Sequence, residues 1–337
     1  MAVTQDIAMD DSSYTYRPAP IIRGFGWCTL AVMFAFLINN VLTFWWGWTG
    51  VAPLLGMSDD GIGWQAIVQA AIYAGAVFIA LKHTRDRGTA PLRDDSATVT
   101  GWNTFFIRAA FWVVFLVGLA DMAISALRVE GMLPELVGEE MASNLGRSQF
   151  RGFYVHGPIV LIGILLAAVT RTLGFIWLAL LVVVAELAIV FTRFVFSYEQ
   201  AYMGDLVRFW YAALFLFASA YTLLEDGHVR VDVFYAGFAR RNKALVNSVG
   251  SILLGMTLCW TVILLGMWSK SSIINSPILV YEVTQSGFGL YLKYFMAGFL
   301  AVFAISMMMQ FVAMLFEASA DRRGEPGGRD LNTDIIH

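Results

Sequence analysis

The sequence predicts an all-α, polytopic integral membrane protein with about eight transmembrane helices and a short interfacial amphipathic segment. First, 58% of the 337 residues are hydrophobic and 14% are charged, whereas soluble domains contain about 45–50% apolar and about 25% charged residues. Second, several apolar runs reach the roughly 20 residues that a helix needs to cross a bilayer. Third, these runs are continuous and lack the alternation of a membrane β-barrel strand.

Eight apolar runs are interpreted as membrane spans. The predicted spans are 24–47, 62–81, 102–127, 153–170, 172–196, 206–224, 244–268 and 288–316. The fourth and fifth together are about twice as long as the hydrocarbon layer is thick, so we expect two helices with a tight turn at Arg171. The predicted divisions are a cytoplasmic tail (1–23), a four-helix extension (24–171), a four-helix domain (172–318) and a second cytoplasmic tail (319–337).

Positively charged residues predict the orientation of these spans. With the N-terminus inside, fourteen Lys and Arg residues fall in inner segments and four in outer loops. Because cytoplasmic loops carry the excess of Lys and Arg, both termini are predicted to be cytoplasmic. Trp45 and Trp268 then mark the outer interface, where tryptophan is enriched.

The spans fall into two groups of four with one layout. Each group has a short outer loop, a basic inner loop of about 20 residues and a longer outer loop. Parallel repeats occur in membrane proteins. Layout alone leaves a duplication and a coincidence both open.

Motifs for a cofactor or for catalysis are missing from the sequence. Haem held between helices needs histidines inside spans, but His83, His228 and His337 lie in loops or at the terminus, and His156 lies near a span end. No nucleotide-binding loop, metalloprotease motif or nucleophile elbow is present. We therefore expect no cofactor, no enzymatic activity and no nucleic-acid partner.

Ionisable residues lie inside or at the ends of the fifth and sixth predicted spans. Glu186 lies near the middle of span 172–196 and is predicted to be a buried charge, because such a group must face protein or water. Arg193 follows two turns later on about the same face, and Asp205 and Arg208 begin the next span. These charges could form an ion path, or they could pair between helices or with another subunit. The sequence favours pairing, because no chain of acids crosses the bilayer.

The segment 225–243 is predicted to connect two spans on the cytoplasmic side. If it is helical, Val231, Phe234, Tyr235 and Phe238 share one face, and the segment would lie in the plane of the interface. The alternative is a basic loop that only fixes topology.

The stretch VFTRFVFSYEQAYMGDLVRFWYAALFLFASAYTLLEDGHVRVDVFYAGFARRNKALVNSVGSIL resembles the small membrane (DctQ-like) subunit of tripartite ATP-independent periplasmic (TRAP) transporters. The positions that match the family pattern directly are Arg193, Phe194, Gly227, His228, Arg230 and Asp232. Asp205 stands where the family usually carries Glu. The resemblance covers about 172–316 and includes EVTQSGFGLYLKYFM. The four preceding spans make the chain similar to longer family members with extra N-terminal helices.

This resemblance implies a membrane scaffold for a large, elevator-type (DctM-like) permease subunit in sodium-driven uptake of an organic acid. A periplasmic substrate-binding protein would deliver that acid. The residues expected at the partner interface are Arg193, Asp205, Gly227, His228, Arg230 and Asp232. Arg240, Arg241 and Lys243 are expected to hold anionic lipid head groups. Glu199 and Asp205 are expected to help dock the binding protein. The alternatives are a membrane anchor subunit of a redox complex and a self-sufficient carrier.

Overall fold

The computed structural model describes residues 14–57, 61–171, 175–224, 235, 237–283 and 289–328. Within these ranges the chain is helical and contains no strand, and eight helices are long and apolar enough to cross a membrane. The predicted all-α membrane fold is therefore confirmed. The elements are α1 (Pro20–Phe44), η2 (Ala52–Leu55), α2 (Trp64–Asp86), α3 (Leu92–Val129), α4 (Leu133–Val137), α5 (Glu139–Leu145), α6 (Ser148–Phe150), η3 (Arg151–His156), α7 (Gly157–Val169), α8 (Phe175–Phe196), α9 (Ala201–Leu224), α11 (Arg240–Gly250), η4 (Ser251–Met256), α12 (Thr257–Met267), α13 (Asn275–Val280) and α14 (Lys293–Arg323).

Two of the helices extend well past their predicted ends. α3 has 38 residues and begins at Leu92, so most of the predicted inner loop before residue 102 is helical. Asp94 and Asp95 in its first turn favour this start, because carboxylates stabilise the positive end of a helix. α14 runs to Arg323, so the predicted tail 319–337 begins inside a helix. Hydropathy detects the apolar part of a helix and misses these polar ends.

The chain forms two compact units. Unit 1 comprises residues 1–100, 229–257 and 308–337, and unit 2 comprises residues 101–228 and 258–307. Each unit contains residues from both sides of the division predicted after residue 171, which stays a prediction.

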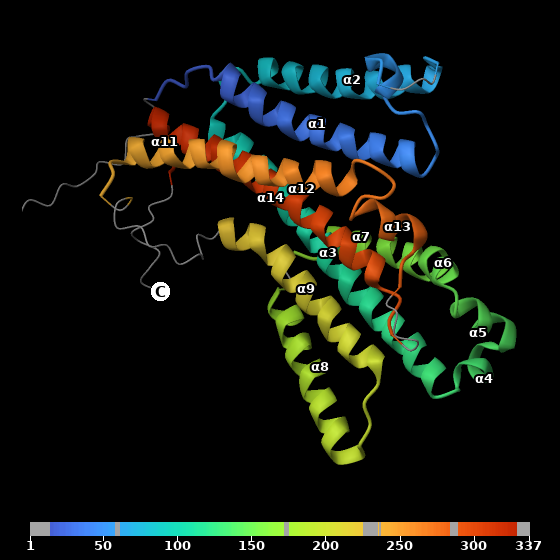
Figure 1. Cartoon of the computed structure of the whole chain (residues 1–337). Helices are drawn as coiled ribbons and strands as arrows, with labels where there is room; N and C mark the ends of the chain where they lie inside the picture. The colour runs from blue at the N-terminus through green and yellow to red at the C-terminus, as the bar shows by residue number, and fades with distance from the viewer. Residues whose placement is uncertain are drawn as a thin grey trace, which may run out of the picture. The chain divides into compact units, whose positions relative to one another are not determined.

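In unit 1, α1 and α2 pack side by side (Figure 1). Two amides join them: Asn39 Nδ2 donates to the backbone carbonyl of Gln69 at 3.3 Å, and Gln69 Nε2 donates to Thr43 Oγ1 at 2.9 Å. α1 also approaches α14 closely, since a Cβ on Gly26 would lie 2.5 Å from the ring of Phe316. Interhelical hydrogen bonds between polar side chains and close contacts at small residues are typical of packing between membrane helices.

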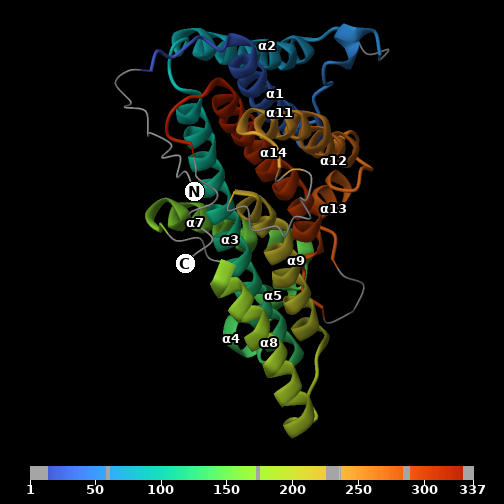
Figure 2. The same ribbon diagram turned by 90° about the vertical axis from the view of Figure 1, so that its left-hand side faces the viewer.

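In unit 2, the core joins part of α3 to α8, α9 and part of α14. Its buried residues include Phe111 and Val117 of α3, Phe209 and Phe217 of α9, and Phe299 of α14. α8 and α9 form a hairpin whose helices run side by side in both ribbon views (Figure 1 and Figure 2). The core therefore holds α9 in place, whereas most of α8 is held by its packing on α9.

Candidate partner interface

The α8–α9 hairpin exposes most of α8. Only 6% of the apolar window of this span is buried. Ile176 and Phe194 are at least 80% exposed, whereas Leu178 is buried against the core. Exposed apolar side chains suit lipid and protein equally, so the charged side chains on this surface are more informative.

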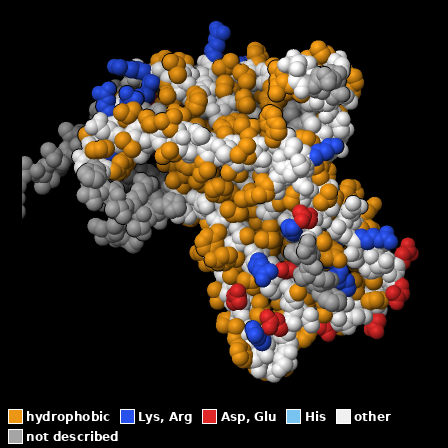
Figure 3. Space-filling view, viewed as in Figure 1, with side chains coloured by type: hydrophobic (Ala, Val, Ile, Leu, Met, Phe, Trp, Pro, Cys, Tyr) orange, Lys and Arg blue, Asp and Glu red, His pale blue; other side chains and the backbone are white. Residues whose placement is uncertain are grey.

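A groove of about 380 Å³ lies along the hairpin. Its lining residues are Glu186, Ile189, Val190, Arg193, Phe194, Glu199, Gly204, Val207 and Arg208. Two carboxylates and two guanidinium groups thus share an otherwise apolar groove. The space-filling view shows both basic and acidic side chains over the hairpin (Figure 3).

Three of the sequence-predicted residues, Glu186, Arg193 and Glu199, line this groove together. Arg193 Nε lies 3.3 Å from Glu199 Oε2, and both side chains are exposed. Glu186 is exposed in the chain rather than buried within it, which corrects the prediction of a buried charge. The reason is geometric: Leu181, Val182 and Ala185 of α8 pack against the core, whereas Glu186 lines the groove.

Asp205 has contacts inside the chain. Its Oδ2 accepts a hydrogen bond from the backbone N–H of Leu290 at 3.1 Å, and its Oδ1 lies 3.4 Å from Arg208 Nη1. The side chain is 10% exposed. Asp205 therefore connects the start of α9 to the segment before α14.

The connection between α8 and α9 is joined to the end of α3. The hydroxyl of Tyr198 donates a hydrogen bond to the carboxylate of Glu130. This bond raises the pKa of Tyr198 above its ordinary value, because removing the hydroxyl proton would place two negative charges together.

The basic cluster predicted to hold lipid head groups lies at the start of α11. Arg240 Nη2 lies 2.8 Å from Asp321 Oδ1, so its charge is paired within unit 1. The Lys243 ammonium lies 5.4 Å from the ring centre of Tyr235, in cation–π range. Arg241 is exposed. The motif residues Gly227, His228, Arg230 and Asp232 lie outside the described residues.

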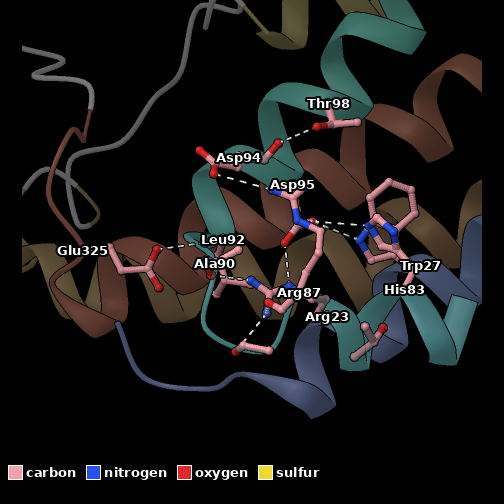
Figure 4. A network of polar contacts seen from close by, with 12 residues as sticks. Arg23, Trp27, His83, Arg87, Ala90, Leu92, Asp94, Asp95, Thr98 and Glu325 are labelled. Carbon is pink, nitrogen blue, oxygen red and sulfur yellow. Dashed lines mark hydrogen bonds and ion pairs between the residues drawn. The ribbon is translucent and has the colours of Figure 1, made fainter. Parts of the chain in front are cut away.

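A buried network in unit 1, which was not predicted from the sequence, is centred on Asp95 (Figure 4). Arg23 is 1% exposed, and its Nε lies 2.6 Å from Asp95 Oδ2. Its other nitrogens donate to the carbonyls of Arg87 and Ala90, both at 2.6 Å. Trp27 Nε1 donates to the other Asp95 oxygen at 3.3 Å. The network fixes α1 against the turn between α2 and α3. In the sequence, Arg23 and Arg87 belong to the basic inner segments that predict the orientation of the spans. Only the fold brings both guanidinium groups to the Asp95 carboxylate.

A second buried network, also not predicted, lies in unit 2. Arg151 Nη1 lies 2.7 Å from Asp121 Oδ1, and both side chains are 0% exposed. His156 Nε2 lies 3.2 Å from the same oxygen, and its Nδ1 bonds the hydroxyl of Tyr294. Both ring nitrogens of His156 are therefore engaged, which argues against haem ligation and against the redox-anchor alternative. Asp121 Oδ2 also accepts from the backbone N–H of Tyr291 at 2.7 Å.

Comparison with known proteins shows a similarity over the C-terminal part of the chain. Residues 179–321 match the family model described as tripartite ATP-independent periplasmic transporters, DctQ component. The matched region contains the whole groove and the basic start of α11. No curated protein and no solved structure matches the chain significantly. Over residues 179–321, the chain is therefore similar to the DctQ component of the tripartite ATP-independent periplasmic transporters.

Proposed function

We propose that this chain is the small permease subunit of a tripartite ATP-independent periplasmic transporter, and that it is a static membrane scaffold for an elevator-type large subunit in sodium-driven uptake of an organic acid. DctQ components work with a large DctM subunit and a periplasmic binding protein, and they are transporter components rather than enzymes. In this proposal the large subunit carries the substrate and sodium, and the binding protein delivers the acid. The N- and C-termini lie in the cytoplasm of a bacterium, with the chain in its inner membrane.

The observation that carries the proposal is the charged groove on the exposed hairpin. Glu186, Arg193 and Arg208 line it within or beside membrane spans. Charged groups at membrane depth face protein or water rather than lipid. A scaffold that binds a second subunit through α8 and α9 provides such an environment.

The residues outside the groove have supporting roles in this proposal. The motif residues Gly227, His228, Arg230 and Asp232 brace the assembly on the cytoplasmic side. Arg241 and Lys243 contact anionic lipid head groups, each contributing about 1 kcal/mol near the surface. Glu199, at the end of the hairpin, lies on the side that receives the binding protein.

Co-purification and transport test the proposal. The tagged chain, co-expressed with the DctM-like protein of its own system, should recover that protein from detergent extracts. Vesicles holding both subunits should take up substrate when the binding protein and an inward sodium gradient are present, and vesicles with the chain alone should not. Uptake by the chain alone would establish the carrier alternative, and a haem absorption band in the purified chain would establish the redox anchor.

A further inference from the structure

Two acidic side chains line the groove, Glu186 and Glu199. Of these, Glu186 lies near the midpoint of a described span, and its side chain is exposed. The span runs from Ile176 to Phe196, so Glu186 lies ten residues from either end. At about 1.5 Å rise per residue, this is about 15 Å from each end, which is about half of the hydrocarbon thickness. A carboxylate at this depth has no access to bulk water along a lipid-facing surface.

The arginines of the groove are already paired with other acids. Arg193 lies 3.3 Å from Glu199, and Arg208 lies 3.4 Å from Asp205. Glu186 makes no hydrogen bond or ion pair with any residue that the structure describes. Both arginines that line the groove are therefore in intrachain ion pairs, whereas the Glu186 carboxylate has no partner among the described residues.

The walls around Glu186 fit a packed helix. Ile189, Val190 and Val207 supply apolar surface on both sides of the groove. Gly204 also lines it, and a Cβ at this position would meet nothing within 4 Å, so space is open there. Small residues at such places allow the backbones of membrane helices to approach closely.

We propose that Glu186 pairs with a Lys or Arg side chain on a transmembrane helix of the large subunit, which packs into the α8–α9 groove. This inference rests on the proposed scaffold function and specifies the chemistry of its interface. Charge complementarity selects the occupant: a basic side chain neutralises the groove carboxylate that has no partner among the described residues. A lipid chain offers no donor at that depth.

The test compares Glu186→Lys and Glu186→Gln with Leu187→Gln in the co-purification assay. Leu187 is 63% exposed and is the next residue of α8, but it does not line the groove. We expect Glu186→Lys to lower recovery of the large subunit at least about tenfold, as loss of a desolvated charge pair does. Glu186→Gln should lower recovery less, because its amide oxygen still accepts a hydrogen bond. Leu187→Gln should match the wild type.

Two further measurements keep the inference separable from the scaffold function and from misfolding. All variants should reach the membrane at wild-type levels and unfold at the wild-type temperature. A photo-cross-linking residue at Val190 should join the chain to the large subunit, whereas the same residue at Leu187 should not. Wild-type recovery with Glu186→Lys, or cross-links only to lipid or to a second copy, would overturn the inference. A wild-type chain that recovers no large subunit would instead refute the scaffold function itself.

Discussion

Arg151 and Asp121 form an ion pair that is removed from solvent on both sides, with each side chain 0% exposed. Such pairs stabilise a fold only while both partners are present, because a lone buried charge keeps its full desolvation cost. Arg151 lies just before the predicted span 153–170, where a basic residue between apolar runs is expected to be in a loop. Arg193 and Glu186, by contrast, were found because they lie inside an apolar run. Asp121 and Arg151 are 30 residues apart in the sequence, and only the folded chain brings them into contact.

We expect Arg151→Met to lower the stability of the protein by roughly 3–5 kcal/mol, because it leaves the Asp121 carboxylate buried without its guanidinium partner. Thermal unfolding of the purified protein in detergent measures this loss. Arg147→Ala is the control, since Arg147 is exposed on the same segment. The double variant Asp121→Leu with Arg151→Met should be more stable than Arg151→Met alone. Equal unfolding temperatures for Arg151→Met and Arg147→Ala would contradict the expectation.

The packing of α7 on α3 is the closest approach of two helix backbones around a glycine in unit 2. A Cβ on Gly163 would lie 2.9 Å from the backbone nitrogen and 3.1 Å from the Cα of Val113. Hydropathy was sufficient to predict that both helices exist, because each contains a long apolar run. It could not predict which glycine faces which helix, since apolar residues cover every side of a membrane helix.

We expect Gly163→Ala to destabilise the protein by roughly 1–3 kcal/mol, the usual cost of an overpacked contact. The nearest atom is Cγ2 of Val113 at 2.7 Å, but two backbone atoms of α3 lie almost as close, so a side-chain rotation alone does not relieve the clash and α7 must move. Gly101→Ala on α3 is the matched control, because a Cβ there meets nothing within 4 Å. Removing this helical glycine should leave the unfolding temperature unchanged or raise it slightly. The same detergent unfolding assay compares the two, and equal losses would show that packing at Gly163 is not limiting.

In each of the two units, residues of the N-terminal extension contact residues of the family-matched region or of the tail that follows it. In unit 1, Arg93 of α3 donates to Asp321 of α14 at 2.7 Å and to the carbonyl of Pro326 at 2.8 Å. The backbone N–H of Leu92 donates to Glu325 Oε2 at 3.0 Å. In unit 2, Phe111 and Val117 of the extension lie in the same core as α9. The sequence predicted the number and order of spans and a division after residue 171. Pairing between segments more than 200 residues apart depends on tertiary packing that no local pattern encodes.

These contacts predict that the family-matched half does not fold well without the extension. Expressed alone, residues 172–337 would expose the core face of α9 and leave Asp321 and Glu325 without their partners on α3. We expect this fragment to accumulate in the membrane at a small fraction of the full-length level. Co-expression of residues 1–171 as a separate chain should restore its level, and the two fragments should co-purify, because covalent continuity is not needed for the contacts. Pulse labelling and affinity recovery of tagged fragments measure both effects. If residues 172–337 alone persisted as long as the full chain, the extension would be an independent module, and the buried contacts of α3 with α9 and α14 would contribute little to stability.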